Sequence, residues 1–260
     1  MRKSFLIPLL SLACQTPATE KQIPKPAVTQ LATTMAGKPW KTIGEIPVPP
    51  GFERTIRADG SFTAWLRRLP LRADKTVYLY NGWKKRNQSA QYAVIDQPLA
   101  GGELEQCADV IIHLRTLYLL SAGKRSQIRF SDNAKHEYTL TLNAGAQQLQ
   151  QYLVTVFARC GTASLEKQLP LVPAGSAEAG DVLIKGGAPG HAMLIADMAK
   201  DKNGHTIYLL LQGYMPAQDM HVVINPLAAA ISPWYRLDTT EIETPEWTFS
   251  GNDLHSWERR

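Results

Sequence analysis

The chain of 260 residues is long enough for one large domain or two small ones, and its 44% hydrophobic and 20% charged residues are ordinary for a globular protein. The formal net charge of +5 is modest. No cluster of Lys and Arg with interleaved aromatic residues stands out, which argues against a nucleic-acid partner.

The N-terminus has the pattern of a secretory signal. A basic start precedes a short apolar run, Phe5 to Leu12, that is too short to cross a bilayer as a helix. Cys14 follows, and the segment resembles the lipobox of bacterial lipoproteins, in which such a cysteine carries the lipid. We therefore expect residues 1–13 to be a lipoprotein signal peptide and Cys14 to be lipidated. The alternative is an ordinary signal peptide in which Cys14 is incidental.

The polar, Pro-rich residues 14–36 are typical of a flexible tether between a membrane and a folded domain. We expect residues 37–260 to form that single domain. Its first helix should be short, with Ser61 as N-cap and an end near Pro70. Residues 102–123 keep a helical period with one apolar face, and the pattern stops at a glycine suited to a C-cap.

The rest of the domain is predicted to contain strands and one more helical stretch. Residues 126–145 alternate like a strand pair, and residues 146–169 favour a helix that breaks at Gly161. Because the helices come early and antiparallel strands late, we expect an α+β domain. Three late strands are expected over residues 180–187, 191–198 and 205–215, the last two joined by a turn at Asn203-Gly204.

Cys107 lies near the start of the helix expected over residues 102–123. A thiolate is the nucleophilic form of cysteine, and a helix N-terminus lowers the pKa of a thiol. Glu103 and Glu105 oppose this effect, so a histidine partner is needed. Two alternatives are a buried apolar cysteine and, in an exported protein, a disulfide with Cys160 that would remove the thiol chemistry.

His191 follows a glycine-rich approach and opens a strand, so its imidazole can face a cleft at the rim of the sheet and act as a base near neutral pH. A surface or core histidine is the alternative. We expect the other histidines to lie on the outer side of the Cys107 helix (His113), in solvent (His136, His205 and His255), or as a second candidate base (His221).

Gln212 ends an apolar run, and its amide could accept a hydrogen bond from a histidine and fix the tautomer of that ring. The expected hairpin brings Gln212 within about a rung or two of His191. Whether the two side chains share a face depends on the register of the strands. A polar cap at the end of a strand is the alternative.

Together these stretches resemble a known family. QCADVIIHLR and GDVLIKGGAPGHAMLIAD resemble motifs of papain-like cysteine peptidases of the NlpC type, the bacterial cell-wall endopeptidases, and Gln212 matches their third, polar residue. The resemblance implies a papain-like α+β fold, with N-terminal helices on an antiparallel sheet, and Cys107 as nucleophile, His191 as base and Gln212 as orienting residue. Arg129 to Arg159 would be inserted elements. Gln106 stands where Asp or Asn commonly precedes the cysteine.

A second resemblance covers most of the chain and is closer. The segments YNGWKKRNQSAQYAVID, LEQCADVIIHLR, GDVLIKGGAPGHAMLIAD and QGYMPAQDMHVV resemble an uncharacterised family of exported bacterial lipoproteins, catalogued as a domain of unknown function. That family implies no established activity.

We therefore expect a membrane-anchored lipoprotein of the cell envelope, in the periplasm or outer membrane, that acts as a thiol hydrolase (peptidase or amidase) on peptidoglycan peptides or a related amide. The oxyanion would be held by the backbone N–H of Cys107 and a second donor, for which Gln88, Tyr92 and Gln106 are candidates. We expect no cofactor and no metal site, because the cysteines and histidines lack zinc-finger and HExxH spacing.

The alternative function is a non-catalytic envelope lipoprotein of the same fold that binds a peptide or a glycan. Aromatic side chains could then line a groove, although core and rim packing would explain them equally. The aromatic residues considered are Trp65, Trp83, Trp234, Tyr235 and Trp247.

Overall fold

The computed structural model describes residues 40–237 and 240–257, which belong to one unit of the chain, Pro39–Arg260. The expected signal peptide over residues 1–13, Cys14 and the tether over residues 14–36 lie outside the described residues. Within the described residues, no helix combines the length and the apolar character needed to cross a bilayer.

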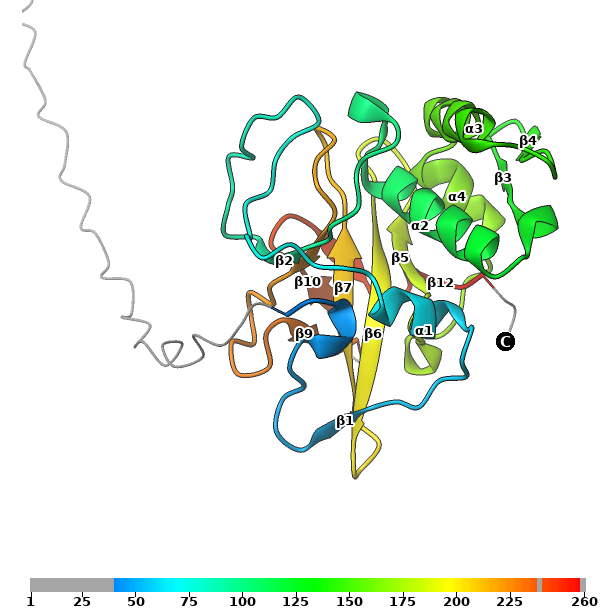
Figure 1. Ribbon diagram of the computed structural model, residues 1–260. Helices are drawn as coiled ribbons and strands as arrows, with labels where there is room; N and C mark the ends of the chain where they lie inside the picture. Colours follow the sequence, from blue (N-terminus) through cyan, green and yellow to red (C-terminus); the bar gives the residue numbers. More distant parts are fainter. Residues whose placement is uncertain (1–39, 238–239, 258–260) are drawn as a thin grey trace, which may run out of the picture. The chain divides into compact units, whose positions relative to one another are not determined.

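An antiparallel sheet of eight strands forms the centre of the described part of the chain (Figure 1). Its strands follow the order β12-β5-β6-β7-β8-β2, while β1 pairs with β6 and β9 pairs with β7. The long strand β6 (His191–Asp201) is therefore the axis of the sheet. The other strands of this sheet are β1 (Phe52–Arg54), β2 (Gln91–Val94), β5 (Val182–Lys185), β7 (Thr206–Gln212), β8 (His221–Val223), β9 (Trp234–Tyr235) and β12 (Leu254–His255).

Two small hairpins and the helices complete the described domain. In Figure 1, α1 and α2 lie across one face of the sheet at β6, and α4 lies beside β5. The α-helices are α1 (Phe62–Arg67), α2 (Cys107–Ser121), α3 (Ala146–Arg159) and α4 (Thr162–Gln168), the 3-10 helices are η1 (Ile43–Glu45), η2 (Gly102–Leu104), η3 (Arg125–Gln127) and η4 (Ala174–Ser176), and the hairpins pair β3 (Arg129–Ser131) with β4 (Glu137–Thr139) and β10 (Glu241–Glu243) with β11 (Thr248–Ser250).

Both faces of β6 are buried. Neighbouring side chains of a strand point to opposite sides, and those of β6 enter a different core cluster on each side. Ala192 and Leu194 belong to the core cluster that contains the apolar residues of α1 and α2. Met193 and Ile195 belong to a second cluster on the other face, which includes Phe249 of the β10–β11 hairpin. The nearly unbroken apolar run of β6 in the sequence reflects this burial on two sides.

The observed elements confirm the expected α+β class and several local signals. Ser61 Oγ accepts the backbone N–H of Ala64 at 3.2 Å, as expected for the N-cap of α1. Gly123, just after α2, has a φ of 68°, which favours glycine and ends the helix. The helical stretch over residues 146–169 breaks into α3 and α4 on either side of Gly161.

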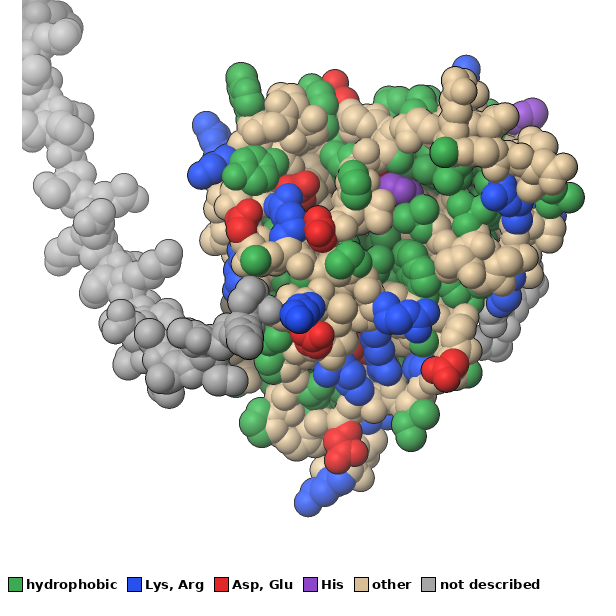
Figure 2. Space-filling view, in the orientation of Figure 1, with side chains coloured by type: hydrophobic (Ala, Val, Ile, Leu, Met, Phe, Trp, Pro, Cys, Tyr) green, Lys and Arg blue, Asp and Glu red, His purple; other side chains and the backbone are tan. Residues whose placement is uncertain are grey.

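One buried charge lies in the inner part of β6, at a shift of register between Ile195 and Asp197. Asp197 is fully buried, and its two carboxylate oxygens accept hydrogen bonds from Arg54 Nε and Arg67 Nε, each at 2.7 Å. Arg54 also donates to the carbonyl of Ile46 at 2.5 Å. This cluster joins β1, α1 and β6. Figure 2 shows Lys and Arg side chains over α1 and the neighbouring segments on this side of the domain.

Candidate active site

The start of α2 positions Cys107. Gln106 is the N-cap residue, and its backbone N–H donates to the side chain of Asp109 at 3.0 Å, which fixes the first turn. Cys107 is the first helical residue, so its own backbone N–H has no partner within the helix. Its side chain is half-buried.

Gly213, immediately after β7, allows this helix start to sit on the end of the sheet. A Cβ atom at position 213 would lie 2.5 Å from Val110 Cγ2 and 3.0 Å from the carbonyl oxygen of Gln106. The first distance is shorter than real carbon contacts and the second is tight, so any side chain at position 213 would displace Val110 or the start of the helix. The close contact brings the nucleophile candidate next to the end of β7, where Gln212 lies.

The thiol of Cys107 lies against the beginning of β6. The backbone N–H groups of Ala108, Ala192 and Cys107 itself interact with the sulfur in the direction that lowers its pKa. Burial acts more strongly, and together with the nearby carboxylate of Asp109 it raises the pKa of the thiol to about 11. The resting group is therefore a protonated thiol at neutral pH. Its contact with Ala192 places the sulfur one residue from His191 in the chain.

His191 opens β6 opposite Lys185 of β5 and is 2% exposed. Its ring packs among aromatic side chains, with centroid distances of 5.0 Å to Tyr214, 5.5 Å to Trp247 and 5.8 Å to Phe249. Burial lowers the pKa of this imidazole to about 4, although its hydrogen bond with Gln212 acts in the other direction. The ring is neutral at physiological pH and can accept a proton.

Gln212 ends β7, and the register of the sheet brings its side chain to the face that carries His191. Leu194 pairs with Leu211, so Gln212 lies diagonally across the β6–β7 ladder from His191. Gln212 Oε1 lies 2.9 Å from His191 Nε2, which joins the two side chains by a hydrogen bond. The sequence left open whether they share a face, and this bond answers that question.

Cys107 and His191 line the same cavity, which has a volume of about 690 Å³. Gln106, Tyr214 and Trp247 also line it, and Asp109 is the one acidic residue among the described residues of a lining that contains no Lys or Arg. Cys160 lines the cavity as well, yet both described cysteines are free thiols. The alternative of a Cys107–Cys160 disulfide is therefore not what the structure contains.

The three candidates for the second oxyanion donor have different positions. Gln106 lines the cavity, and its side-chain amide donates to the carbonyl of Glu103 at 3.3 Å. Gln88 and Tyr92 do not line it. Gln88 is committed to its own loop, where Nε2 donates to the carbonyls of Val77 and Lys85 at 2.8 Å. Tyr92 of β2 stacks on Trp40 with ring centroids 5.1 Å apart.

Two expectations for the other histidines are wrong. His113 is not on the outer side of α2: it is 3% exposed, and its Nδ1 lies 2.7 Å from the carboxylate of Glu105. His255 is not solvated, because β12 buries it and its Nδ1 lies 2.9 Å from the carbonyl of Leu169. In both cases a hydrogen bond to an oxygen offsets the cost of burying the polar ring, and the local sequence does not show that this partner is present. His136 and His205 are exposed as expected.

The aromatic residues considered for a groove do not form one. Trp234 and Tyr235 are 0% and 2% exposed and belong to the core. Trp65 packs against Phe62 and Tyr118. Trp83 is 73% exposed and does not line the cavity. Trp247 alone among the five lines it.

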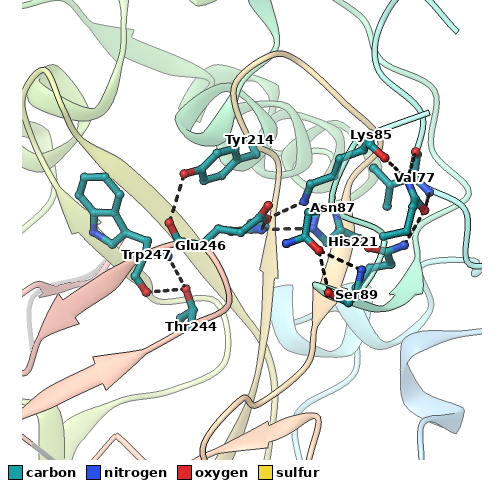
Figure 3. Close-up of polar contacts among 12 residues, drawn as sticks. Val77, Lys85, Asn87, Ser89, Tyr214, His221, Thr244, Glu246 and Trp247 are labelled. Carbon is teal, nitrogen blue, oxygen red and sulfur yellow. Dashed lines mark hydrogen bonds and ion pairs between the residues drawn. The ribbon is translucent and has the colours of Figure 1, made fainter. Parts of the chain in front are cut away.

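Sequence reasoning missed two charged residues beside the candidate triad. Glu246, in the turn of the β10–β11 hairpin, accepts a hydrogen bond from Gln212 Nε2 at 2.8 Å. Lys85, in the loop before β2, donates to the same oxygen of Glu246 at 2.6 Å (Figure 3). Both residues occur in polar stretches typical of surface loops, so no local pattern distinguishes them from solvated charges.

Comparison with known proteins supplies a family and no activity. Neither a curated protein nor a solved structure matches the chain. A family model described as "Domain of unknown function (4846)" matches residues 43–141 and 132–256, which span the described fold and every candidate site residue from Gln88 to Gln212. The chain therefore belongs to this family of unknown function.

Proposed function

We propose that the protein is a thiol hydrolase with a papain-like fold of the NlpC type, in which Cys107 is the nucleophile, His191 the base and Gln212 the orienting residue. The observation that carries the proposal is the hydrogen bond of 2.9 Å between His191 Nε2 and Gln212 Oε1, beside a cavity that Cys107 also lines. A helix with cysteine at its first position, packed on an antiparallel sheet that carries histidine and glutamine on adjacent strands, supports the papain-like assignment.

The chemistry follows from the free atoms of the site. Cys107 Sγ attacks the carbonyl carbon of an amide while His191 Nδ1, which has no hydrogen-bond partner among the described residues, removes the thiol proton. The imidazolium then gives this proton to the leaving amine, and a thioester remains on Cys107. Water, deprotonated by His191, hydrolyses the thioester to a carboxylic acid and restores the thiol. The backbone N–H of Cys107 and the side-chain amide of Gln106 are the donors proposed for the oxyanion.

The resting thiol and imidazole are both neutral in this scheme. With a thiol pKa of about 11 and an imidazole pKa of about 4, a preformed thiolate–imidazolium pair would be costly before substrate binds. Proton transfer therefore accompanies attack, as in general-base catalysis, rather than preceding it.

We propose a peptidoglycan peptide or a related amide as substrate, and an envelope lipoprotein anchored through Cys14 as the setting. The lipobox-like segment in the sequence supports the setting. The cavity of about 690 Å³ has room for a short peptide segment around the scissile bond.

The test compares the wild-type chain with Cys107→Ala, using Cys160→Ala as the matched control because both thiols line the cavity. Purified peptidoglycan peptides are incubated with each protein, and the products are separated by chromatography and identified by mass. We expect cleavage by the wild type and the control, and a loss of at least roughly a thousandfold in Cys107→Ala. Equal cleavage by Cys107→Ala would show that the thiol is not the nucleophile.

A second candidate is a non-catalytic protein that binds a peptide or glycan in the same cavity. The raised pKa of the Cys107 thiol favours it, because a thiol that stays protonated is a poor nucleophile. Binding without cleavage in the wild type, unchanged in Cys107→Ala and weakened in Trp247→Ala, would support this function over hydrolysis.

A further inference from the structure

Gln212 is the centre of a buried polar network, and its side chain has no exposed surface. Its Oε1 lies 2.9 Å from His191 Nε2, and its Nε2 lies 2.8 Å from Glu246 Oε2 and 3.1 Å from His221 Nε2. His221 lies directly opposite Gln212 in the β7–β8 ladder. Three neighbouring strands thus contribute His191, Gln212 and His221 to one line of contacts.

The direction of the Gln212 amide follows from the partners at its far end. His221 Nδ1 lies 2.9 Å from the carbonyl of Asp219, which can only accept a hydrogen bond, so Nδ1 carries the proton of the neutral ring. Burial lowers the pKa of His221 to about 3, with a further contribution from Lys85, so this ring stays neutral. His221 Nε2 is then an acceptor and requires the NH₂ group of Gln212.

Glu246 requires the same orientation. Its carboxylate can only accept, so it also binds the NH₂ group of Gln212, and the amide oxygen is left for His191. The hydrogen-bond partners therefore determine which side-chain atom of Gln212 is the nitrogen and which is the oxygen. An amide oxygen opposite His191 Nε2 places the ring proton on Nε2 and leaves Nδ1 free.

Lys85 holds Glu246 in place. Their side chains are only 7% and 12% exposed, and Nζ lies 2.6 Å from the oxygen that Gln212 also contacts. Lys85 is in turn held by its loop, where its backbone N–H donates to Val77 and its carbonyl accepts from Gln88. The hydroxyl of Tyr214 donates to the backbone carbonyl of Glu246 at 3.1 Å, as Figure 3 shows.

We propose that Glu246, with Lys85 and His221, forms a positioning network that fixes the amide of Gln212 and thereby selects the His191 tautomer with its proton on Nε2. The tautomer itself follows from these contacts. Its catalytic consequence, a free Nδ1 that can act as base toward Cys107, rests on the proposed hydrolase function. None of the three residues contacts the thiol, so each acts through Gln212.

The wild-type chain provides the first test and needs no variant. The ring nitrogens of His191 are observed by ¹⁵N NMR of the labelled, folded chain at pH 7, where the protonated nitrogen is identified from its shift and its coupling to hydrogen. We expect the proton on Nε2. A proton on Nδ1 would overturn the proposal.

Variants then test which residues select the tautomer. Glu246→Ala combined with His221→Phe removes both acceptors and should give a mixture of the two His191 tautomers, whereas Glu246→Gln keeps a side-chain oxygen and should retain the wild-type tautomer. Glu243→Gln, at an exposed position of β10, is the matched control. A folded double variant with the unmixed wild-type tautomer would contradict the network.

Activity separates this inference from the proposed function. We expect Glu246→Ala to slow hydrolysis by roughly ten- to a hundredfold, the range found when a residue that orients a metal-binding histidine is lost, while alkylation of Cys107 at pH 10 stays unchanged. An Nε2 proton in a wild-type chain that cleaves nothing would support the positioning network and refute the hydrolase. Cleavage by a wild-type chain whose His191 carries its proton on Nδ1 would support the hydrolase and refute the positioning network.

Discussion

Two buried polar clusters on β6 differ in how completely their atoms are paired. Asp197 has both oxygens bound by guanidinium groups, and Arg54 extends the cluster to a backbone carbonyl. His191, at the start of the same strand, uses Nε2 for Gln212 and leaves Nδ1 unpaired at a cavity that also contains a thiol. A carboxylate with both oxygens paired can stabilise the fold but has no acceptor left for chemistry, whereas the unpaired ring nitrogen can accept a proton from a group in the cavity.

The largest loss of stability should come from breaking the ion pairs of Asp197. Asp197→Ala leaves Arg54 and Arg67 without their carboxylate, and removal of one partner from a buried ion pair costs about 3–5 kcal/mol of unfolding free energy. Urea unfolding of variant and wild type measures the loss. Probe labelling of Cys107 in the folded variant should stay at the wild-type level. A loss below about 1 kcal/mol would mean that the cluster is not the stabilising one.

The histidine cluster should weaken the fold in acid. His191 and His221 have folded pKa values of about 4 and about 3, below the ordinary value of about 6.5 in an unfolded chain. Between about pH 6.5 and 4 the unfolded chain therefore binds more protons, so stability falls as the pH falls. We expect a loss of about 2.5 kcal/mol per histidine between pH 7 and 4.5.

Urea unfolding at these two pH values, on wild type and on His221→Gln, isolates the contribution of one ring. The variant should lose about 2.5 kcal/mol less than the wild type on acidification. His136→Gln, at an exposed position, is the control and should behave as wild type does. Identical pH dependence in His221→Gln and wild type would show that the buried ring does not set the acid sensitivity.

A methyl group at Gly213 should separate the two elements that form the site. Gly213→Ala forces α2 away from the end of β7, and overpacking of this kind costs about 1–3 kcal/mol. Gly175→Ala is the matched control, because a Cβ there would meet open space. Thermal unfolding measures both variants. Equal stability of the two would mean that the contact between Gly213 and Val110 adjusts easily.

The smallest expected effect is the pH dependence of the alkylation rate of the Cys107 thiol. Because only the thiolate reacts and the pKa of Cys107 is about 11, its alkylation rate in the wild type should rise about tenfold per pH unit between pH 7 and 10. Mass spectrometry of peptides labelled with iodoacetamide follows the reaction at each pH. A rate that levels off near pH 7 would indicate a thiolate already stabilised by His191. The His191 cluster would then contain a charge pair, as the Asp197 cluster does.

The α+β class and the proximity of His191 to Gln212 could be predicted because they depend on short-range signals. A turn at Asn203-Gly204 joins β6 to β7, and a histidine and a glutamine at the facing ends of one hairpin cannot be far apart. The helical period predicted α2 and its end near Gly123, but its start was placed five residues too early, because residues 102–104 form the separate 3-10 helix η2 and α2 begins at Cys107. Register alone remained open, since a slip of one residue turns every side chain to the other face.

The partners of Gln212 could not be predicted, because they come from distant segments with no shared pattern. Lys85 and Glu246 are separated by 161 positions and lie in loops whose local sequence favours solvent exposure. His221 was noted as a candidate, but its pairing with Gln212 depends on the β7–β8 ladder. Gln88 and Tyr92 resembled oxyanion donors by residue type, while their positions depend on loop packing that residue type does not encode.

The ion pair between Lys85 and Glu246 joins an early segment of the chain to a late one, so the restraint on Gln212 requires nearly the whole chain. A contact between residues so far apart in the chain requires a long loop to close, which costs conformational entropy. A growing polypeptide that already contains its sulfur nucleophile and its imidazole would still lack the restraint on the amide until the last hairpin docks. Glu246 follows Cys107, His191 and Gln212 in the chain, so the candidate triad gains this restraint on its amide only once the β10–β11 hairpin has been made and has docked.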